Sequence, residues 1–196
     1  MTIAVIDSGG ANLGSVMHAL NRLGQEALLT SDAATIRSAE RVILPGVGAA
    51  AWAMRALERA GLVETIRALD KPVLGICLGL QLLYDSSAEG ETACLGLIPG
   101  RVEPLPRGDG LRLPHTGWNQ LHWSRPDDPL ARHLRPDDWF YFVHGFGAPV
   151  EHALATSDHG SRFAAVVRKD NFTACQFHPE KSADAGARLL RGFLET

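Results

Sequence analysis

The first half of the chain alternates between short apolar runs and segments in which apolar residues recur every three or four positions. The runs predict buried strands over residues 3–7, 26–30, 41–46 and 72–76. The recurring pattern predicts helices over residues 13–23, which Gly24 would end, over residues from about 49 to 60, and again after residue 77. Because strands that alternate with helices usually pair in parallel, this order favours a parallel sheet with helices on both faces.

The second half contains mostly short strand candidates, separated by Gly, Asp, Pro and Asn turns. These candidates lie in "GLIPGRVEPL", "GWNQLHWS", "WFYFVHGF", "HALATS", "FAAVVRKD" and "FTACQFH". Helical spacing returns only in the C-terminal "SADAGARLLRGFLE", where Ser182 is placed to be the N-cap. We expect a single α/β domain over residues 1–196, with a central mixed, mainly parallel sheet flanked by helices.

Composition and charge narrow the classes of function. The chain has 196 residues, 45% of them hydrophobic, and a formal net charge of −3 with both signs spread along its length. This distribution does not favour a nucleic-acid-binding stripe or a polybasic membrane patch. The N-terminus "MTIAVIDSGG" has no signal-peptide pattern, and no apolar run approaches the roughly 20 residues that span a bilayer. We expect a soluble, cytoplasmic protein.

The cysteines do not suggest a disulfide framework or a metal site. The chain has three, Cys77, Cys94 and Cys175, an odd number that lie far apart. No C-x-x-C or H-x-x-x-H spacing indicates zinc, so no metal ligands are expected.

Cys77 stands between two glycines where a predicted strand turns into a helix. The pattern Gly75-Ile76-Cys77-Leu78-Gly79 has the form of a strand-to-helix elbow around a nucleophile. In so tight a turn, side chains two positions away on either side would collide. The elbow would place the thiol at a helix N-terminus, which favours thiolate, and aim the Leu78 N–H at a carbonyl under attack. A buried structural cysteine between helix-packing glycines would give the same local pattern.

His178 is the histidine that its neighbours mark out as a base. It ends the strand-like run "FTACQF" and is followed by Pro179 and Glu180. Proline biases the residue before it to an extended backbone. Glu180 can fold back to orient the imidazole and stabilise its cation, so the pattern predicts a Cys77–His178–Glu180 triad. Other histidines lie in polar surroundings and are expected at the surface: His18, His122, His133, His152 and His159.

A glycine-rich loop, "LPGVGAA" over residues 44–50, follows one predicted strand and precedes a helix. It should therefore open at the same sheet edge as Cys77 and could supply a second oxyanion donor, although a tight turn alone would explain the glycines. A phosphate-binding loop is disfavoured, because no P-loop Lys-Ser/Thr follows and the G-x-G-x-x-G spacing is absent.

Taken together, the motifs "PGVG", "GICLGLQLL" and "FHPEKS" resemble those of the triad-type class I glutamine amidotransferases. The segments "IDSGGANLGSV" (6–16), "HTGWNQL" (115–121) and "YFVHGF" (141–146) extend the resemblance over nearly the whole chain. "HTGWN", "YFVH" and the Lys after H-P-E narrow it to the glutaminase subunits of imidazole glycerol phosphate synthase.

The resemblance implies a role for each matching residue. Cys77 would attack the side-chain amide of glutamine to form a γ-glutamyl thioester. His178 would protonate the leaving ammonia and then activate water, with Glu180 orienting it. The remaining implied contacts are an oxyanion site of Gly46, Val47 and the Leu78 N–H, and a glutamine site of Gly48, Gln81 and Glu89.

The resemblance also implies a partner. Ammonia would pass to a (β/α)8-barrel cyclase subunit, in a heterodimer that makes imidazole glycerol phosphate and an aminoimidazole carboxamide ribotide for histidine biosynthesis. Positions implied near this interface are Asn12, Trp118, Asn119 and Lys181.

Three alternatives remain at this level. An amidotransferase of another pathway, serving anthranilate, GMP or pyridoxal phosphate synthesis, shares the elbow and the H-P-E motif. A stand-alone cysteine peptidase or esterase could use a similar elbow, although "HPEKS" and "HTGWN" would have no role in it. A non-catalytic scaffolding subunit is disfavoured because Cys77, His178 and Glu180 are all present.

Overall fold

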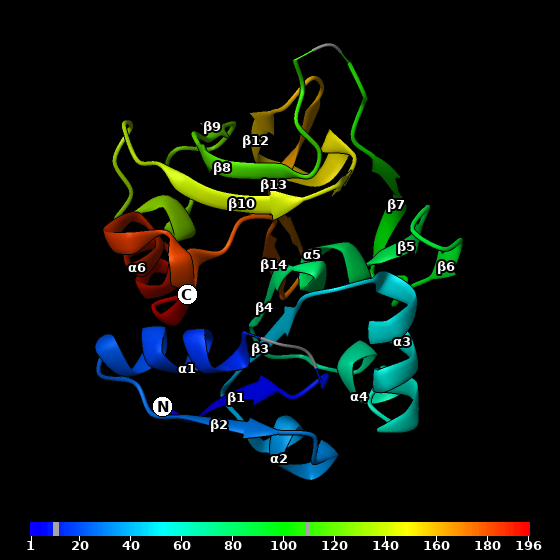
Figure 1. Cartoon of the computed structure of the whole chain (residues 1–196). Helices are drawn as coiled ribbons and strands as arrows, with labels where there is room; N and C mark the ends of the chain where they lie inside the picture. The colour runs from blue at the N-terminus through cyan, green and yellow to red at the C-terminus, as the bar shows by residue number, and fades with distance from the viewer. Residues whose placement is uncertain (10–11, 109) are drawn as a thin grey trace.

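A central sheet of eight strands runs through the protein (Figure 1), which we describe from a computed structural model covering residues 1–9, 12–108 and 110–196. Gly10 and Ala11, within the motif "IDSGGANLGSV", therefore lie outside the described residues. The strands up to β14 pair in parallel, and those beyond it pair antiparallel. Their order is β2 (Ala27–Thr30), β1 (Ile3–Ile6), β3 (Arg41–Gly46), β4 (Val73–Cys77), β14 (Phe172–Cys175), β13 (Arg162–Lys169), β12 (Ala153–Asp158) and β9 (His122–Trp123).

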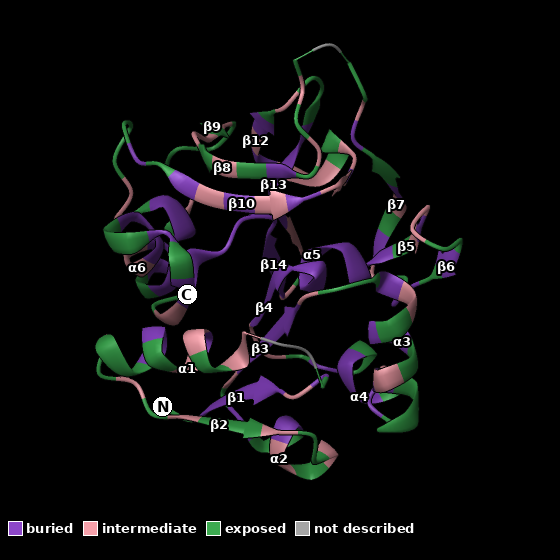
Figure 2. Ribbon diagram, viewed as in Figure 1, coloured by how far each residue is buried: buried purple, intermediate pink, exposed green. Residues whose placement is uncertain are grey.

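Helices cover both faces of this sheet. In β1, Ile3 and Val5 face the apolar core that includes residues of α1 and α6, whereas Ala4 and Ile6 face the core that includes residues of α2, α3, α4 and α5. Figure 2 shows the sheet strands near its middle as buried and the outer surfaces of α1 and α3 as exposed. The helices are α1 (Leu13–Arg22), α2 (Ala33–Ser38), α3 (Ala50–Arg59), α4 (Val63–Arg67), α5 (Leu78–Leu82) and α6 (Ala183–Leu194).

Two smaller sheets stand beside the central one. The ribbon of β8 and β10 crosses the upper part of the molecule in Figure 1, and its strand β10 reaches the carboxyl ends of the parallel strands. The smaller sheets contain β11 (Phe146–Gly147), β7 (Ile98–Pro104), β5 (Tyr84–Ser87) and β6 (Thr92–Ala93), and β10 (Phe140–His144) with β8 (His115–Asn119). Short 3-10 helices lie at η1 (Pro129–Ala131), η2 (Val150–His152) and η3 (Pro179–Lys181).

The predicted fold class is confirmed, and the first half follows the predicted order closely. Helix α1 ends before Gly24, whose φ of +73° closes the turn as the sequence predicted. The helix after Cys77 is shorter than its apolar pattern suggests. It ends at Leu82 because the carbonyls of Leu82 and Leu83 accept hydrogen bonds from Leu95, Leu97 and Ile98, and the chain continues as strand β5.

Ser182 is the N-cap residue of α6, but its side chain does not cap the helix. Its hydroxyl donates to the carbonyl oxygen of His178 at 2.7 Å and accepts from the Tyr141 N–H at 2.9 Å. Ser182 therefore holds the N-cap position that the sequence predicted, without a side-chain capping bond. Ser182 ties the turn after β14 to strand β10 instead.

No helix in the described parts of the chain is long and apolar enough to cross a bilayer.

Candidate active site

Cys77 ends strand β4 in a strained backbone conformation. Its φ of 55° and ψ of −108° lie outside the regions that L-residues usually adopt, and α5 begins at the next residue. Such strain is kept only where the surroundings impose it, and it is concentrated at functional positions. Here the turn places the side chain at the carboxyl edge of the sheet, in the wall of a cavity.

The two flanking glycines make this turn possible. A Cβ at Gly75 would lie 2.9 Å from the carbonyl carbon and oxygen of Gly79, and a Cβ at Gly79 would lie 1.9 Å from the carbonyl oxygen of Leu44. A side chain at either position would therefore collide chiefly with backbone atoms, and not with a side chain at the other position as the sequence suggested. Gly46, paired with Cys77 across β3 and β4, has the side chain of Leu78 at 3.0 Å from its missing Cβ.

His178 is fixed by contacts on both sides of its backbone. Its N–H donates to the Tyr141 carbonyl at 2.9 Å, and its carbonyl accepts from the Ser182 hydroxyl. The backbone is extended, with φ −100° and ψ 95°, as Pro179 predicted. Gly186 of α6 packs directly against the turn, since a Cβ there would lie 1.9 Å from the Pro179 carbonyl oxygen.

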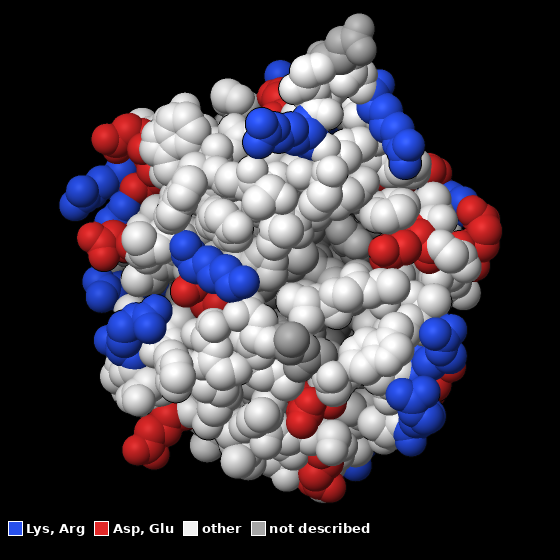
Figure 3. All heavy atoms as spheres, viewed as in Figure 1, with Lys and Arg blue, Asp and Glu red and all other residues white. Residues whose placement is uncertain are grey.

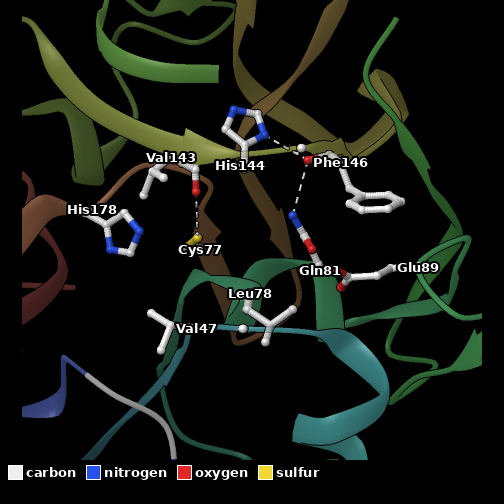
Figure 4. A pocket seen from close by; sticks show the side chains of 11 residues that line it. Val47, Cys77, Leu78, Gln81, Glu89, Val143, His144, Phe146 and His178 are labelled. Atoms are coloured by element: carbon white, nitrogen blue, oxygen red, sulfur yellow. Dashed lines mark hydrogen bonds between the residues drawn. The ribbon is translucent and has the colours of Figure 1, made fainter. Parts of the chain in front are cut away.

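The imidazole of His178 is held by Glu180. Nδ1 lies 2.7 Å from Glu180 Oε1, while Nε2 forms no hydrogen bond with the residues that the structure describes and faces the cavity beside Cys77 (Figure 4). Burial by itself would lower the pKa of His178. The interactions with the neighbouring Cys77 and Glu180 outweigh burial and raise the pKa of His178 to about 10. The arrangement can therefore hold a proton on the imidazole next to the sulfur.

The cavity has a volume of about 210 Å³ and lies where the carboxyl ends of β3 and β4 meet β10. Figure 4 shows Cys77 and His178 on one side of it and Gln81 and Glu89 on the other. The residues that line it are Val47, Gly48, Cys77, Leu78, Gln81, Glu89, Val143, His144, Gly145, Phe146 and His178.

Most residues predicted for glutamine and oxyanion binding meet in this cavity. Gln81 is buried, and its Nε2 donates to the Phe146 carbonyl at 3.2 Å. Glu89 Oε2 accepts from the Ala50 N–H at 2.8 Å, so this carboxylate also caps the start of α3. Val47, Gly48 and Leu78 line the cavity, whereas Gly46 and Glu180 border a smaller hollow behind it.

Comparison with known proteins places this arrangement in a family. The sequence profile of the family "Glutamine amidotransferase class-I" matches residues 4–196. The chain belongs to the class-I glutamine amidotransferases. It is an enzyme of this family, and its curated relatives match it over nearly their full length.

Three similar proteins show how far the similarity reaches. "Imidazole glycerol phosphate synthase subunit HisH" of Xanthomonas euvesicatoria pv. vesicatoria is 54% identical over 194 residues, covering 98% of this chain and 96% of the relative. The subunit of the same name from Idiomarina loihiensis is 50% identical, covering 100% and 98%. A solved structure described as a glutamine amidotransferase superposes with a TM-score of 0.76 at 21% identity, covering 98% and 97%, which supports the fold.

Within this amidotransferase fold, the residues predicted near a partner interface do not share one environment. Trp118 is 50% exposed on β8, and Lys181 is exposed at the end of η3. Asn119 is held by its own chain, because its Nδ2 donates to the Asp158 carbonyl at 2.9 Å. Asn12, the N-cap of α1, contacts Glu180.

The sequence reasoning missed two polar residues at the site. His144 lines the cavity, and its Nδ1 donates to the Phe146 carbonyl at 2.8 Å. Gln176 is fully buried behind Cys77. A sequence signal for Gln176 existed: it is a polar residue in the apolar run "FTACQF", two positions before His178, so an extended chain turns both side chains to the same side.

Among the described residues, no cluster of three or more His, Cys, Asp or Glu side chains is arranged to hold a metal ion. The functional groups that line the cavity include the thiol of Cys77, the imidazole of His178 and the carboxylate of Glu89.

Proposed function

We propose that this chain is the glutaminase subunit of an imidazole glycerol phosphate synthase, which hydrolyses L-glutamine to glutamate and ammonia. The observation that carries the proposal is the meeting of Cys77 and His178 in one cavity, with Glu180 bound to the far side of the imidazole at 2.7 Å. The printed names of relatives that are 50–54% identical support the choice of this enzyme.

The first half of the reaction forms a thioester. The Cys77 thiolate attacks the γ-carbonyl carbon of glutamine, a C–S bond forms, and the carbonyl electron pair moves to oxygen. When the tetrahedral intermediate collapses, the C–N bond breaks and the nitrogen takes the proton from Nε2 of His178, so ammonia leaves. The raised pKa of His178 means that this proton is present at neutral pH. Glu180 holds the ring in place and stabilises its positive charge.

The second half regenerates the enzyme. Water attacks the γ-glutamyl thioester while Nε2 of His178 takes one of its protons, the C–S bond breaks, and glutamate leaves with the thiolate restored. Both halves place negative charge on the same carbonyl oxygen. We assign its stabilisation to the N–H of Leu78, which opens α5 and has no partner within the helix, and to Gly46 and Val47 at the end of β3.

The polar groups across the cavity suit the α-ammonium group of glutamine. Both N–H groups of the Gln81 amide are used, one by the Phe146 carbonyl at 3.2 Å and one by Gln176 Oε1 at 3.0 Å. Only its acceptor oxygen is left for a ligand. The Glu89 carboxylate lies nearby and adds a negative charge, so Gln81, Glu89 and Gly48 are assigned to substrate binding.

The ammonia would be delivered to a (β/α)8-barrel cyclase subunit bound as a heterodimer. That subunit would use it to make imidazole glycerol phosphate and an aminoimidazole carboxamide ribotide. Strand β8 carries Trp118, which is 50% exposed, and Trp139, which is 49% exposed, comes directly before β10. On the face seen in Figure 3, most charged side chains lie toward the rim and the middle is largely uncharged. Exposed aromatic residues with little charge are typical of the central part of a protein interface.

The proposal is tested with Cys77→Ala in the assembled complex. We expect glutamine-dependent turnover to be lost and turnover with added ammonium to be kept, because only ammonia production needs the thiol. Wild-type glutaminase activity should be weak for the isolated chain and should rise strongly when the cyclase and its ligand bind.

Other experimental outcomes would contradict the proposed function. Loss of both activities in Cys77→Ala would count against it, and so would failure of a glutamine-derived electrophile to label Cys77. Co-purification with a partner from anthranilate, GMP or pyridoxal phosphate synthesis would assign the chain to another pathway. Rapid cleavage of peptides or esters without any partner would indicate a stand-alone hydrolase.

A further inference from the structure

Gln176 lies behind the sulfur of Cys77, outside the cavity wall. It follows strand β14, its side chain has no exposed surface, and its backbone N–H donates to the Ala165 carbonyl at 2.9 Å. Its side-chain amide joins two residues of the site. Oε1 accepts from Gln81 Nε2 at 3.0 Å, and Nε2 lies 3.7 Å from Cys77 Sγ.

The orientation of this amide follows from its neighbours. The carbonyl oxygen of Phe146 can only accept hydrogen bonds, so the Gln81 amide turns its nitrogen toward it, at 3.2 Å. The second N–H of Gln81 then meets Gln176, which must present its oxygen there. The NH₂ group of Gln176 is left facing the sulfur of Cys77. One backbone carbonyl thus sets the direction of two buried amides in series.

We propose that Gln176 is a positioning residue of the nucleophile, held by Gln81 so that it donates an N–H to the Cys77 sulfur. The inference rests on the proposed function and deepens it. A donor aimed at sulfur favours the thiolate over the thiol. The Val143 carbonyl, 3.9 Å from the same sulfur, has the opposite preference because it can accept only from the thiol S–H.

The balance between these two contacts affects how much thiolate is ready to react. Gln176 shifts the equilibrium at Cys77 from thiol toward the reactive thiolate, and its side chain does not enter the substrate cavity. The other titratable groups around the sulfur are His178, Glu180, His144, Glu89 and Cys175.

The test measures the pH dependence of alkylation of Cys77 by iodoacetamide in the isolated full-length chain. Peptide mass mapping separates Cys77 from Cys94 and Cys175. The variants are Gln176→Leu and Gln176→Met, and the control is Thr173→Val, a buried substitution three residues away on β14 whose hydroxyl accepts from Arg168.

We expect the midpoint of the alkylation profile to rise by about one pH unit in both Gln176 variants, with a roughly tenfold slower reaction on the acid side of the midpoint. The profile of Thr173→Val should match that of the wild type. A merely structural role would lower the melting temperature in all three proteins and leave the midpoint in place. An unchanged midpoint in a folded Gln176 variant would overturn the proposal.

A second measurement leaves Gln176 unchanged, so it does not depend on a folded Gln176 variant. The side-chain ¹⁵N resonance of Gln176 should shift with pH at the midpoint found for alkylation of Cys77, and the shift should vanish in Cys77→Ala. A resonance that ignores the ionisation of Cys77 would contradict the N–H to sulfur contact.

Neither measurement requires turnover. A chain that shows both responses but never hydrolyses glutamine, even with the cyclase bound, would overturn the proposed function and leave the role of Gln176 intact. A chain that hydrolyses glutamine but shows neither response would overturn the role of Gln176 and leave the proposed function intact.

Discussion

Asn12 donates a hydrogen bond to Glu180, from Nδ2 to Oε1, at 2.6 Å. The same carboxylate oxygen binds Nδ1 of His178 at 2.7 Å, so Oε1 is shared by two donors 166 residues apart in the sequence. The resemblance placed Asn12 near a partner interface, a prediction that stays open. Within the chain, the hydrogen bond from Asn12 connects the start of α1 to Glu180, whose carboxylate orients His178.

Asn12→Ala should lower the kcat of glutamine hydrolysis about tenfold and change KM little. The carboxylate would lose one of its two donors and hold the imidazole less firmly, and a hydrogen bond to a charged group contributes about 1.5–3 kcal/mol. Steady-state kinetics on the assembled complex checks this. Asn21→Ala, at an exposed position on the same helix, is the matched control and should leave kcat unchanged. Equal losses in the two variants would mean that disturbance of α1 is responsible.

Glu89→Gln should raise the KM for glutamine about tenfold with a small change in kcat. The substitution removes the charge that we propose faces the α-ammonium group of glutamine. An amide oxygen can still accept from the Ala50 N–H and keep the start of α3 in place. Glu91→Gln, which removes an exposed charge paired with Arg101, should not change KM. If KM rises in Glu89→Gln and the melting temperature falls as well, the cause would be a weakened cap of α3 and not a lost contact with glutamine.

Gly79→Ala should destabilise the fold by about 3 kcal/mol or prevent folding, because its Cβ would lie 1.9 Å from the Leu44 carbonyl oxygen. Gly14→Ala makes a matched comparison, since nothing lies within 4 Å of its added Cβ and it sits in helix α1. That change should be neutral or stabilise by about 0.5–1 kcal/mol. Urea unfolding of both variants gives the two values. Similar stabilities would show that the elbow tolerates a side chain.

Acid should weaken the protein through the buried pair His115 and His144, which lie Nδ1 to Nε2 at 3.0 Å. Burial lowers the pKa of His115 to about 4 and that of His144 to about 3, so both are neutral in the folded protein at pH 5. The unfolded chain takes up protons on these residues below about pH 6.5. The unfolding free energy is therefore unaffected by these two residues above that pH and falls as the pH drops toward 4, by about 3 kcal/mol for each histidine.

The variant His144→Gln separates this contribution from general acid effects. Glutamine can still accept from His115 and donate to the Phe146 carbonyl, but it does not titrate. The fall in unfolding free energy between pH 6.5 and 4.5 should be shallower in this variant than in the wild type. His18→Gln, at an exposed position on α1, should follow the wild-type curve. Parallel curves for all three proteins would exclude the buried pair as the cause.

Much of the fold could be predicted from local patterns. Strand β3 has the bounds that its apolar run indicated, and Gly24 follows α1 with the positive φ that glycine adopts at low cost. The prediction was weaker where distant segments compete for the same hydrogen bonds. Helix α5 is short because N–H groups of Leu95, Leu97 and Ile98 take the carbonyls at its end, which no local pattern indicates. Ser182 is at the N-cap of α6, but its hydroxyl bonds to His178 and Tyr141 and not to the first N–H groups of the helix.

The sequence by itself determined the chemistry that the site can have. Two glycines around a cysteine specify a tight turn, and a proline and a carboxylate after a histidine specify an extended, oriented imidazole, because these are constraints between neighbours in the chain. Tertiary structure decided which groups surround the sulfur. Gln176, Asn12 and His144 enter the site through hydrogen bonds between strands and helices far apart in sequence. Their roles depend on the order of strands in the sheet, which brings β14 beside β4 and β10 over the carboxyl edge.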